Sequence, residues 1–154
     1  GWPDERWLDI RSDAVKPPLR ARFDAARDKG CDGIEPDNVD GYANTSGFPL
    51  TAADQLAFNR WVAGEVHARG MSVGLKNDLD QIPDLVSDFD WALDEQCQEY
   101  TECDALAPFV SAGKAVFEAE YNVLPAAFCA DSNARNFDAI YKHVELDAFR
   151  TACR

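Results

Sequence analysis

Short apolar runs alternate with longer amphipathic segments along the chain. The apolar runs predict strands, and segments with apolar side chains every three or four residues predict helices. We expect strands at residues 6–10, 32–37, 72–75, 89–94, 115–120 and 139–142. We expect helices at about residues 18–29, 51–69, 83–87, 104–112, 125–132 and 145–153. This alternation predicts a parallel sheet built from βαβ units.

Local signals support several helix boundaries. Pro17 and Pro18 lie where the first helix begins, and proline is tolerated in a first turn. Thr51, followed three residues later by Asp54, resembles a capping box at the start of the longest helix. Three helices end at Gly30, Gly70 and Gly113. The helix-to-strand connections are therefore short, whereas the strand-to-helix loops are longer and more polar, which predicts a working face at the carboxyl ends of the strands.

Ionisable residues lie near the ends of nearly all the predicted strands: Asp9, Asp37, Lys76, Glu95, Glu120 and Lys142. A doubly wound sheet often carries a glycine-rich phosphate loop, which this sequence lacks. A ring of strand ends around one cleft is typical of a (β/α)8 barrel, the TIM-barrel type of α/β fold. Eight units need roughly 200 residues or more, so we expect one domain over residues 1–154 that lacks about two βα units at its amino end.

Composition narrows the range of partners. The formal net charge is −13, which disfavours nucleic acid and anionic membranes and favours a cationic substrate or a metal ion. An acidic surface that serves solubility alone is the alternative. The sequence has no apolar run long enough to span a membrane. Residues 1–5 are polar, so we expect no signal peptide at this start.

Five cysteines in a domain of this size favour a secreted, disulfide-bearing protein. No CxxC pair or histidine cluster suggests zinc. Cys97 and Cys103 are six residues apart, and we expect them to form a bridge. The sequon that begins at Asn44 agrees with secretion. A second bridge between Cys129 and Cys153 would leave Cys31 unpaired.

The segment around Glu35, Pro36 and Asp37 carries the first candidate chemistry. On a strand, Glu35 and Asp37 share one face. Pro36 lies between them and has no N–H, so it weakens the hydrogen bonding of this strand to a neighbouring strand. One strand, ending in Lys76, separates Asp37 from Glu95, so their backbones should lie roughly 9–10 Å apart. Inward-leaning side chains would bring the carboxyl groups into the range of about 5–9.5 Å that glycosidase pairs use, which leaves retaining and inverting mechanisms both open.

Other interpretations remain. Each carboxylate could simply be solvated, or could pair with Lys76. Several carboxylates with Lys76 would also suit a Mg²⁺-dependent lyase or enolase-type barrel. A polysaccharide-binding module without catalysis is the third class, and its aromatic platforms would come from Trp2, Trp7, Tyr42, Phe48 or Tyr121.

Six ordered motifs carry a resemblance to a known family: GWPDERWLDIR, KGCDGIEPDNVDGY, SGFPL, GLKND, FDWALDEQC and KAVFEAEY. Together they resemble glycoside hydrolase family 114, the endo-α-1,4-polygalactosaminidase group. The resemblance implies a (β/α)8 barrel, secretion, and hydrolysis of partly deacetylated galactosamine polymers without a metal ion or other cofactor. It also implies Asp37 and Glu95 as the catalytic pair. The family usually has asparagine where this chain has Asp94, and we expect a charge there to raise the pKa of Glu95.

We therefore expect an endo-acting hydrolase of α-1,4-linked galactosamine polysaccharide that works as a monomer. Asp37 would be the nucleophile, or the base if the enzyme inverts, and Glu95 the general acid. The partner would be a cationic amino-sugar polysaccharide, with no nucleic acid and no membrane. Candidate substrate contacts are Asp9, Glu35, Asn38, Tyr42, Lys76, Asn77, Glu120 and Tyr121.

Overall fold

The computed structural model describes residues 5–154, so the expectation for Trp2 lies outside the described part. Its sheet has the order β1-β2-β3-β4-β5-β6. The strands are β1 (Gly33–Ile34), β2 (Ser72–Lys76), β3 (Trp91–Glu95), β4 (Ala115–Glu120), β5 (Asp138–Tyr141) and β6 (Thr151–Ala152). Strands β1 to β5 are parallel, whereas β6 runs antiparallel to β5. The predicted α/β class with a parallel sheet is confirmed.

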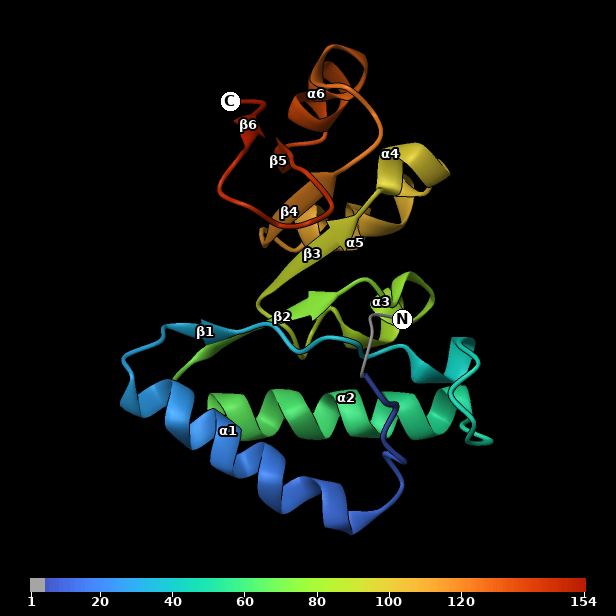
Figure 1. Ribbon diagram of the computed structural model, residues 1–154, viewed down its shortest axis with the longest axis vertical. Helices are drawn as coiled ribbons and strands as arrows, with labels where there is room; N and C mark the ends of the chain where they lie inside the picture. The colour runs from blue at the N-terminus through green and yellow to red at the C-terminus, as the bar shows by residue number, and fades with distance from the viewer. Residues whose placement is uncertain (1–4) are drawn as a thin grey trace.

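The helices flank this sheet in chain order. They are α1 (Lys16–Asp28), α2 (Ala52–His67), α3 (Ile82–Leu85), α4 (Cys97–Tyr100), α5 (Ala107–Ser111) and α6 (Pro125–Ala134). In residues 5–154, 3₁₀ turns lie in the connections: η1 (Asp13–Val15), η2 (Gly41–Ala43), η3 (Leu79–Gln81) and η4 (Cys103–Leu106). Figure 1 shows α1 and α2 side by side below β1 and β2, with α4, α5 and α6 beside the later strands. The predicted capping box of Thr51 and Asp54 starts α2.

The two faces of the sheet differ. On β3, Ala92 and Asp94 are buried toward the helices, whereas Trp91, Leu93 and Glu95 are partly exposed on the opposite face. The helix-facing side chains join those of α2 and α5 in one apolar core. Successive side chains along a strand point to opposite faces of the sheet. Lys76 and Glu95, at the strand ends, therefore lie on the face away from the helices, which is more open.

Three predicted elements differ from the structure. Residues 6–10 form no strand, because Asp9 turns the chain through bonds to Arg11 and Ser12 and the ring of Trp7 packs on Gly41. The predicted strand 32–37 shortens to β1, since pairing ends before Pro36, which has no N–H to donate.

Residues 145–153 form no helix. Instead, Lys142 donates to the carbonyl groups of Asp147 and Phe149, and β6 pairs with β5. The Cys129–Cys153 disulfide holds this segment against α6. Tertiary contacts therefore outweigh local helix propensity here.

Both expected disulfides are present. Cys97–Cys103 ties the start of α4 to η4, directly after β3. Cys129–Cys153 closes a longer loop, and a bridge of that length stabilises a fold by about 3 kcal/mol. Cys31 is an exposed free thiol, as expected. Within residues 5–154, no helix has both the length and the apolar character needed to cross a membrane.

Candidate active site

One lysine joins three carboxylates at the carboxyl ends of β1, β2 and β3. Nζ of Lys76 lies 3.0 Å from Oδ2 of Asp37, 3.2 Å from Oε2 of Glu95 and 3.6 Å from Oε1 of Glu35. Lys76 comes from the last position of β2, on the same face as Glu95. The Lys76 side chain is only 9% exposed, so its charge acts at close range and with little screening by water.

The two acids predicted to act as a pair share this lysine. Because one oxygen of Asp37 and one of Glu95 both contact Nζ of Lys76, they cannot lie farther apart than the two distances together, about 6.2 Å. This bound applies to one oxygen of each acid, so the two carboxyl groups lie inside the upper limit of about 9.5 Å for glycosidase pairs, which is compatible with retaining and with inverting geometry. The peptide bond that follows Asp37 is cis.

Neighbouring strands hold Glu95 in place. The hydroxyl of Tyr121, just after β4, donates a hydrogen bond of 2.5 Å to Oε1 of Glu95. The backbone N–H of Glu95 donates to Oδ1 of Asn77. Asn77 and Gln96 both have positive φ, which turns the chain sharply as β2 and β3 end. Strained backbone of this kind is concentrated at functional sites.

Burial and neighbouring charges shift the pKa values of Glu35, Lys76 and Tyr121. Burial raises the pKa of Glu35, and the charges of Asp37 and Glu95 raise it further, although Lys76 opposes them. Burial by itself would lower the pKa of Lys76, but its hydrogen bond to Asp37 and the charges of Glu95 and Glu35 leave that pKa raised. Burial, followed by the hydrogen bond to Glu95, raises the pKa of Tyr121. Lys76 and Tyr121 therefore keep their protons at neutral pH.

The other candidate contacts lie at various distances from this cluster. Asn38 is exposed in the loop that follows Asp37, and Tyr42 lines a second cavity with Asn77. Glu120 is fully buried, and its Oε1 accepts a bond from the backbone N–H of Gln98, so it cannot reach a substrate here. Successive side chains on β4 point to opposite faces of the sheet, and the side chain of Glu120 lies on the helix-facing side, opposite to that of Ala119.

Asp9 also lies apart from the cluster. It forms an ion pair with Arg11 and ends no strand, because residues 6–10 pair with none. The structure therefore places neither residue in the cluster: the strand predicted to end near Asp9 is absent, and the Glu120 side chain lies on the helix-facing side of β4.

Asp94 does not supply the charge that we expected beside Glu95. It is 1% exposed on the helix-facing side of β3. Burial, followed by the charges of Glu102 and Glu118, raises the pKa of Asp94 to about 8. Asp94 is therefore mostly neutral at pH 7, and its carboxyl group points away from the face that carries Lys76.

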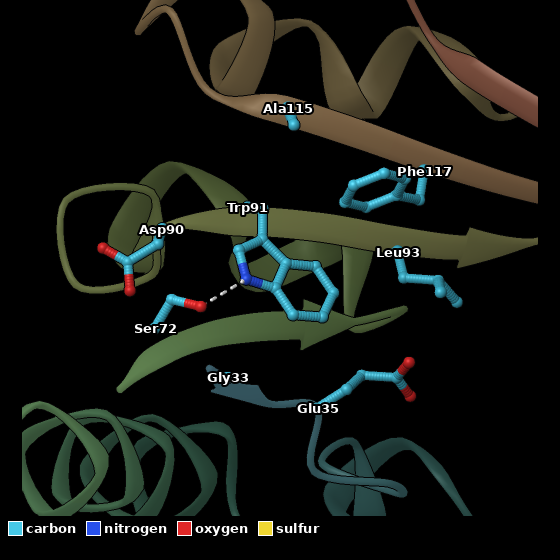
Figure 2. Close-up of a pocket in the computed structure, with 8 residues that line it drawn as sticks. All are labelled: Gly33, Glu35, Ser72, Asp90, Trp91, Leu93, Ala115 and Phe117. Carbon is cyan, nitrogen blue, oxygen red and sulfur yellow. Dashed lines mark hydrogen bonds between the residues drawn. The ribbon is translucent and has the colours of Figure 1, made fainter. Parts of the chain in front are cut away.

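An apolar cavity of about 600 Å³ adjoins the cluster (Figure 2). Glu35 lies at one side of it, and the rings of Trp91 and Phe117 meet edge to face inside it. Nε1 of Trp91 donates to Oγ of Ser72. A Cβ at Gly74 would lie 2.3 Å from the Trp91 ring, so this ring requires glycine on β2. The predicted aromatic platforms do not include Trp91 and Phe117, although Trp91 lies four residues before Glu95 on one strand and so shares its face.

Metal ligands are not gathered at this cluster. Among residues 5–154, the side chains close enough together to hold an ion are Cys97, Cys103 and Glu118. The two cysteines form a disulfide and offer no thiolate. The structure therefore gives the Mg²⁺-dependent alternative no support.

Asp37 and Glu95, which both contact Lys76 at the carboxyl ends of a parallel sheet, place a carboxylate cluster at the edge where α/β proteins carry their sites. Residues 1–154 match the family model described as glycoside-hydrolase family GH114. The chain belongs to this family.

Solved structures agree with that assignment. Ega3 of Aspergillus fumigatus, solved in complex with galactosamine, is 42% identical with a TM-score of 0.93, and the match covers 99% of this chain and 66% of that one. The glycoside hydrolase domain of PelA from Pseudomonas aeruginosa is 13% identical with a TM-score of 0.68, and the match covers 97% of this chain and 70% of that one. The PelA likeness concerns the fold. No protein of curated function matches the chain.

Proposed function

We propose that this protein is an endo-acting glycoside hydrolase that cleaves α-1,4-linked galactosamine polysaccharide. The observation that carries the proposal is the convergence of Asp37 and Glu95 on Lys76 at the carboxyl ends of neighbouring strands. Membership of GH114 and the likeness to Ega3, which was solved with galactosamine, support the reaction class and the sugar. The charge of −13 suits a polymer that carries ammonium groups.

Asp37 acts as nucleophile and Glu95 as general acid. An oxygen of Asp37 attacks the anomeric carbon, while Glu95 gives its proton to the leaving glycosidic oxygen, so the C–O bond breaks and a glycosyl ester forms. Glu95 then takes a proton from water, whose oxygen attacks the same carbon and releases Asp37. The oxygens of the two acids that contact Lys76 lie within about 6.2 Å of each other, which is compatible with this route; in the inverting alternative, Asp37 instead takes a proton from the attacking water.

Lys76 and Tyr121 position the pair. Lys76 contacts both acids, and Tyr121 donates to the oxygen of Glu95 that does not contact Lys76. The oxocarbenium-like transition state gains positive charge, which the surrounding carboxylates stabilise. Asn38, Asn77 and Glu35 then remain as candidate contacts to the sugar hydroxyl and ammonium groups.

Residues 1–154 act here as one catalytic domain of barrel type. The chain spans 66% of the length of the Ega3 chain, so the activity of this chain is part of the proposal. Secretion is proposed from the two disulfides, since such bridges persist in oxidising compartments. We propose that the domain works as a monomer.

The test is release of reducing ends from polygalactosamine by the wild type, Asp37→Asn and Glu95→Gln. Each variant should lose about 10²–10⁴-fold in rate, since each removes a group that takes part in the chemistry. Asp88→Asn, an exposed acid paired with Arg60 away from the cluster, is the matched control and should keep full activity. Equal rates in all four proteins would refute the proposal, and binding of the polymer without cleavage by the wild type would indicate a binding module.

A further inference from the structure

One buried amide on α2 contacts the segments that follow both β1 and β2. Asn59 has no exposed surface. Its Nδ2 donates a hydrogen bond of 3.0 Å to the carbonyl of Val39 and another of 2.9 Å to Oδ2 of Asp78. Val39 lies two residues after Asp37, and Asp78 lies two residues after Lys76. One side chain therefore joins the segments that carry two members of the catalytic cluster.

The remaining polar atom of this amide is also bonded. Oδ1 of Asn59 accepts a hydrogen bond of 2.8 Å from Nε2 of Gln55, one turn earlier on α2. Gln55 is itself buried, so this bond is shielded from water. The helix is fixed in turn by its capping box and by Val62 and Val66 in the core. The Asn59 amide is thus held in one orientation on a rigid element.

Packing alone does not call for asparagine at this position. The other side chains that α2 buries nearby are Val62, Ala63 and Val66, and an amide among them is costly unless every polar atom finds a partner. Both of its partners toward the site lie outside regular structure. Residues 37–39 belong to no helix or strand, and Asp78 has a positive φ. Asn59 therefore supplies to these segments the hydrogen bonds that a helix or a sheet would otherwise provide.

Both contacts of Asn59 lead to the proposed catalytic pair. The bonded carbonyl belongs to the segment that begins with Asp37. The bonded carboxyl belongs to Asp78, whose neighbour Asn77 accepts a hydrogen bond from the backbone N–H of Glu95. We propose that Asn59 is a positioning residue, which sets the separation of Asp37 and Glu95 by holding the segments that follow β1 and β2. This inference rests on the proposed function and adds to it a buried residue that acts through others.

Asn59→Leu keeps the branched shape of the side chain and removes all three hydrogen bonds. On polygalactosamine, kcat should fall about 10–100-fold, because a misplacement of about 1 Å can cost that much in rate. KM should change little, since a fully buried side chain cannot contact the substrate. Reducing-end kinetics measure both constants. Unchanged kcat in a folded Asn59→Leu would overturn the proposal.

Gln81→Met is the matched control. Gln81 is 5% exposed, and its Nε2 donates to the carbonyl of Ala52, so this variant also removes a buried amide that bonds to the backbone. Its melting temperature should fall while kcat stays at the wild-type value. Equal losses of kcat in both variants would assign the effect to overall stability and overturn the proposal. Should Asn59→Leu fail to fold, Gln55→Met carries the test, and its kcat should fall about threefold.

NMR spectra of the same variants test the positioning without any hydrolysis. The backbone amides of Asp37 and Glu95 do not bond to Asn59, so a change in their signals reports a displacement carried through the two segments. Both signals should move in Asn59→Leu, and neither should move in Gln81→Met. Unmoved signals in Asn59→Leu would overturn the proposal.

The two measurements separate this inference from the proposed function. If the wild type releases reducing ends and Asn59→Leu keeps its kcat, the positioning role fails and the hydrolase stands. If the wild type releases none and the signals of Asp37 and Glu95 move in Asn59→Leu alone, the hydrolase fails and Asn59 still positions the two acids.

Discussion

The hydroxyl of Tyr121 donates a hydrogen bond to Oε1 of Glu95 and so links the ends of β4 and β3. The opposite oxygen of Glu95 contacts Lys76. The orientation of the general acid is therefore set from two neighbouring strands, and each contact can be removed separately.

Tyr121→Phe removes the first contact and keeps the ring. A hydrogen bond to a charged group contributes about 1.5–3 kcal/mol, so kcat/KM should fall about 10–100-fold. The measurement is reducing-end kinetics on polygalactosamine, with the melting temperature as a check on folding. Tyr141→Phe, on β5, is the matched control and should keep full activity; an unchanged kcat/KM in Tyr121→Phe would show that Glu95 does not need this donor.

Lys76→Met removes the cation that the three acids share. Breaking a buried ion pair costs about 3–5 kcal/mol, so at pH 7 the free energy of unfolding should fall by about that amount. The difference should shrink toward pH 4, since burial raises the pKa of Glu35 and this acid then takes up a proton and no longer repels its neighbours. Urea unfolding at both pH values measures it. The same loss at pH 4 and pH 7 would assign the effect to packing rather than charge.

Buried acids on the helix-facing side should make the fold less stable as the pH rises. Burial is the main cause that raises the pKa of Asp94 to about 8 and that of Glu118 to about 7. The unfolded chain releases these protons near pH 4, whereas the folded chain keeps them, so the unfolded state binds fewer protons between these limits. The contribution of these two groups to the free energy of unfolding is therefore greatest below about pH 4, and it is lost as the pH rises toward 8.

Asp94→Asn and Glu118→Gln cannot ionise and should remove this loss. Each should raise the free energy of unfolding at pH 8 by about 1–3 kcal/mol and change it less at pH 4. Urea unfolding of both variants and of the wild type at the two pH values gives the comparison. An equal effect at both pH values would mean that neither acid is kept protonated by burial.

Gly74→Ala tests the packing under the apolar cavity. The added methyl would overlap the Trp91 ring, and overpacking of this kind costs about 1–3 kcal/mol. The melting temperature of Gly74→Ala should fall, whereas Gly64→Ala, with open space at its Cβ inside α2, should hold or raise it. A variant with unchanged stability would show that Trp91 is free to move out of the way.

Much of this protein follows from local pattern. The strand β4, the capping box of α2 and the glycine stop after α1 each depend on near neighbours in the chain, and all three appear where the sequence predicts them. Asp37 and Glu95 could be singled out because residues at parallel strand ends share one edge. The Cys97–Cys103 bridge follows in the same way from a short spacing.

The remaining features depended on contacts between distant segments. Residues 145–153 form no helix, because the pairing of β6 with β5 and the bond of Cys153 to Cys129 in α6 outweigh helix propensity. The side on which an acid lies is decided by strand register, which places Glu120 in the interior and Glu95 on the open face. The sequence by itself thus determined the chemistry that is available at the strand ends, and the tertiary structure decided which groups meet, since one residue of register reverses the face.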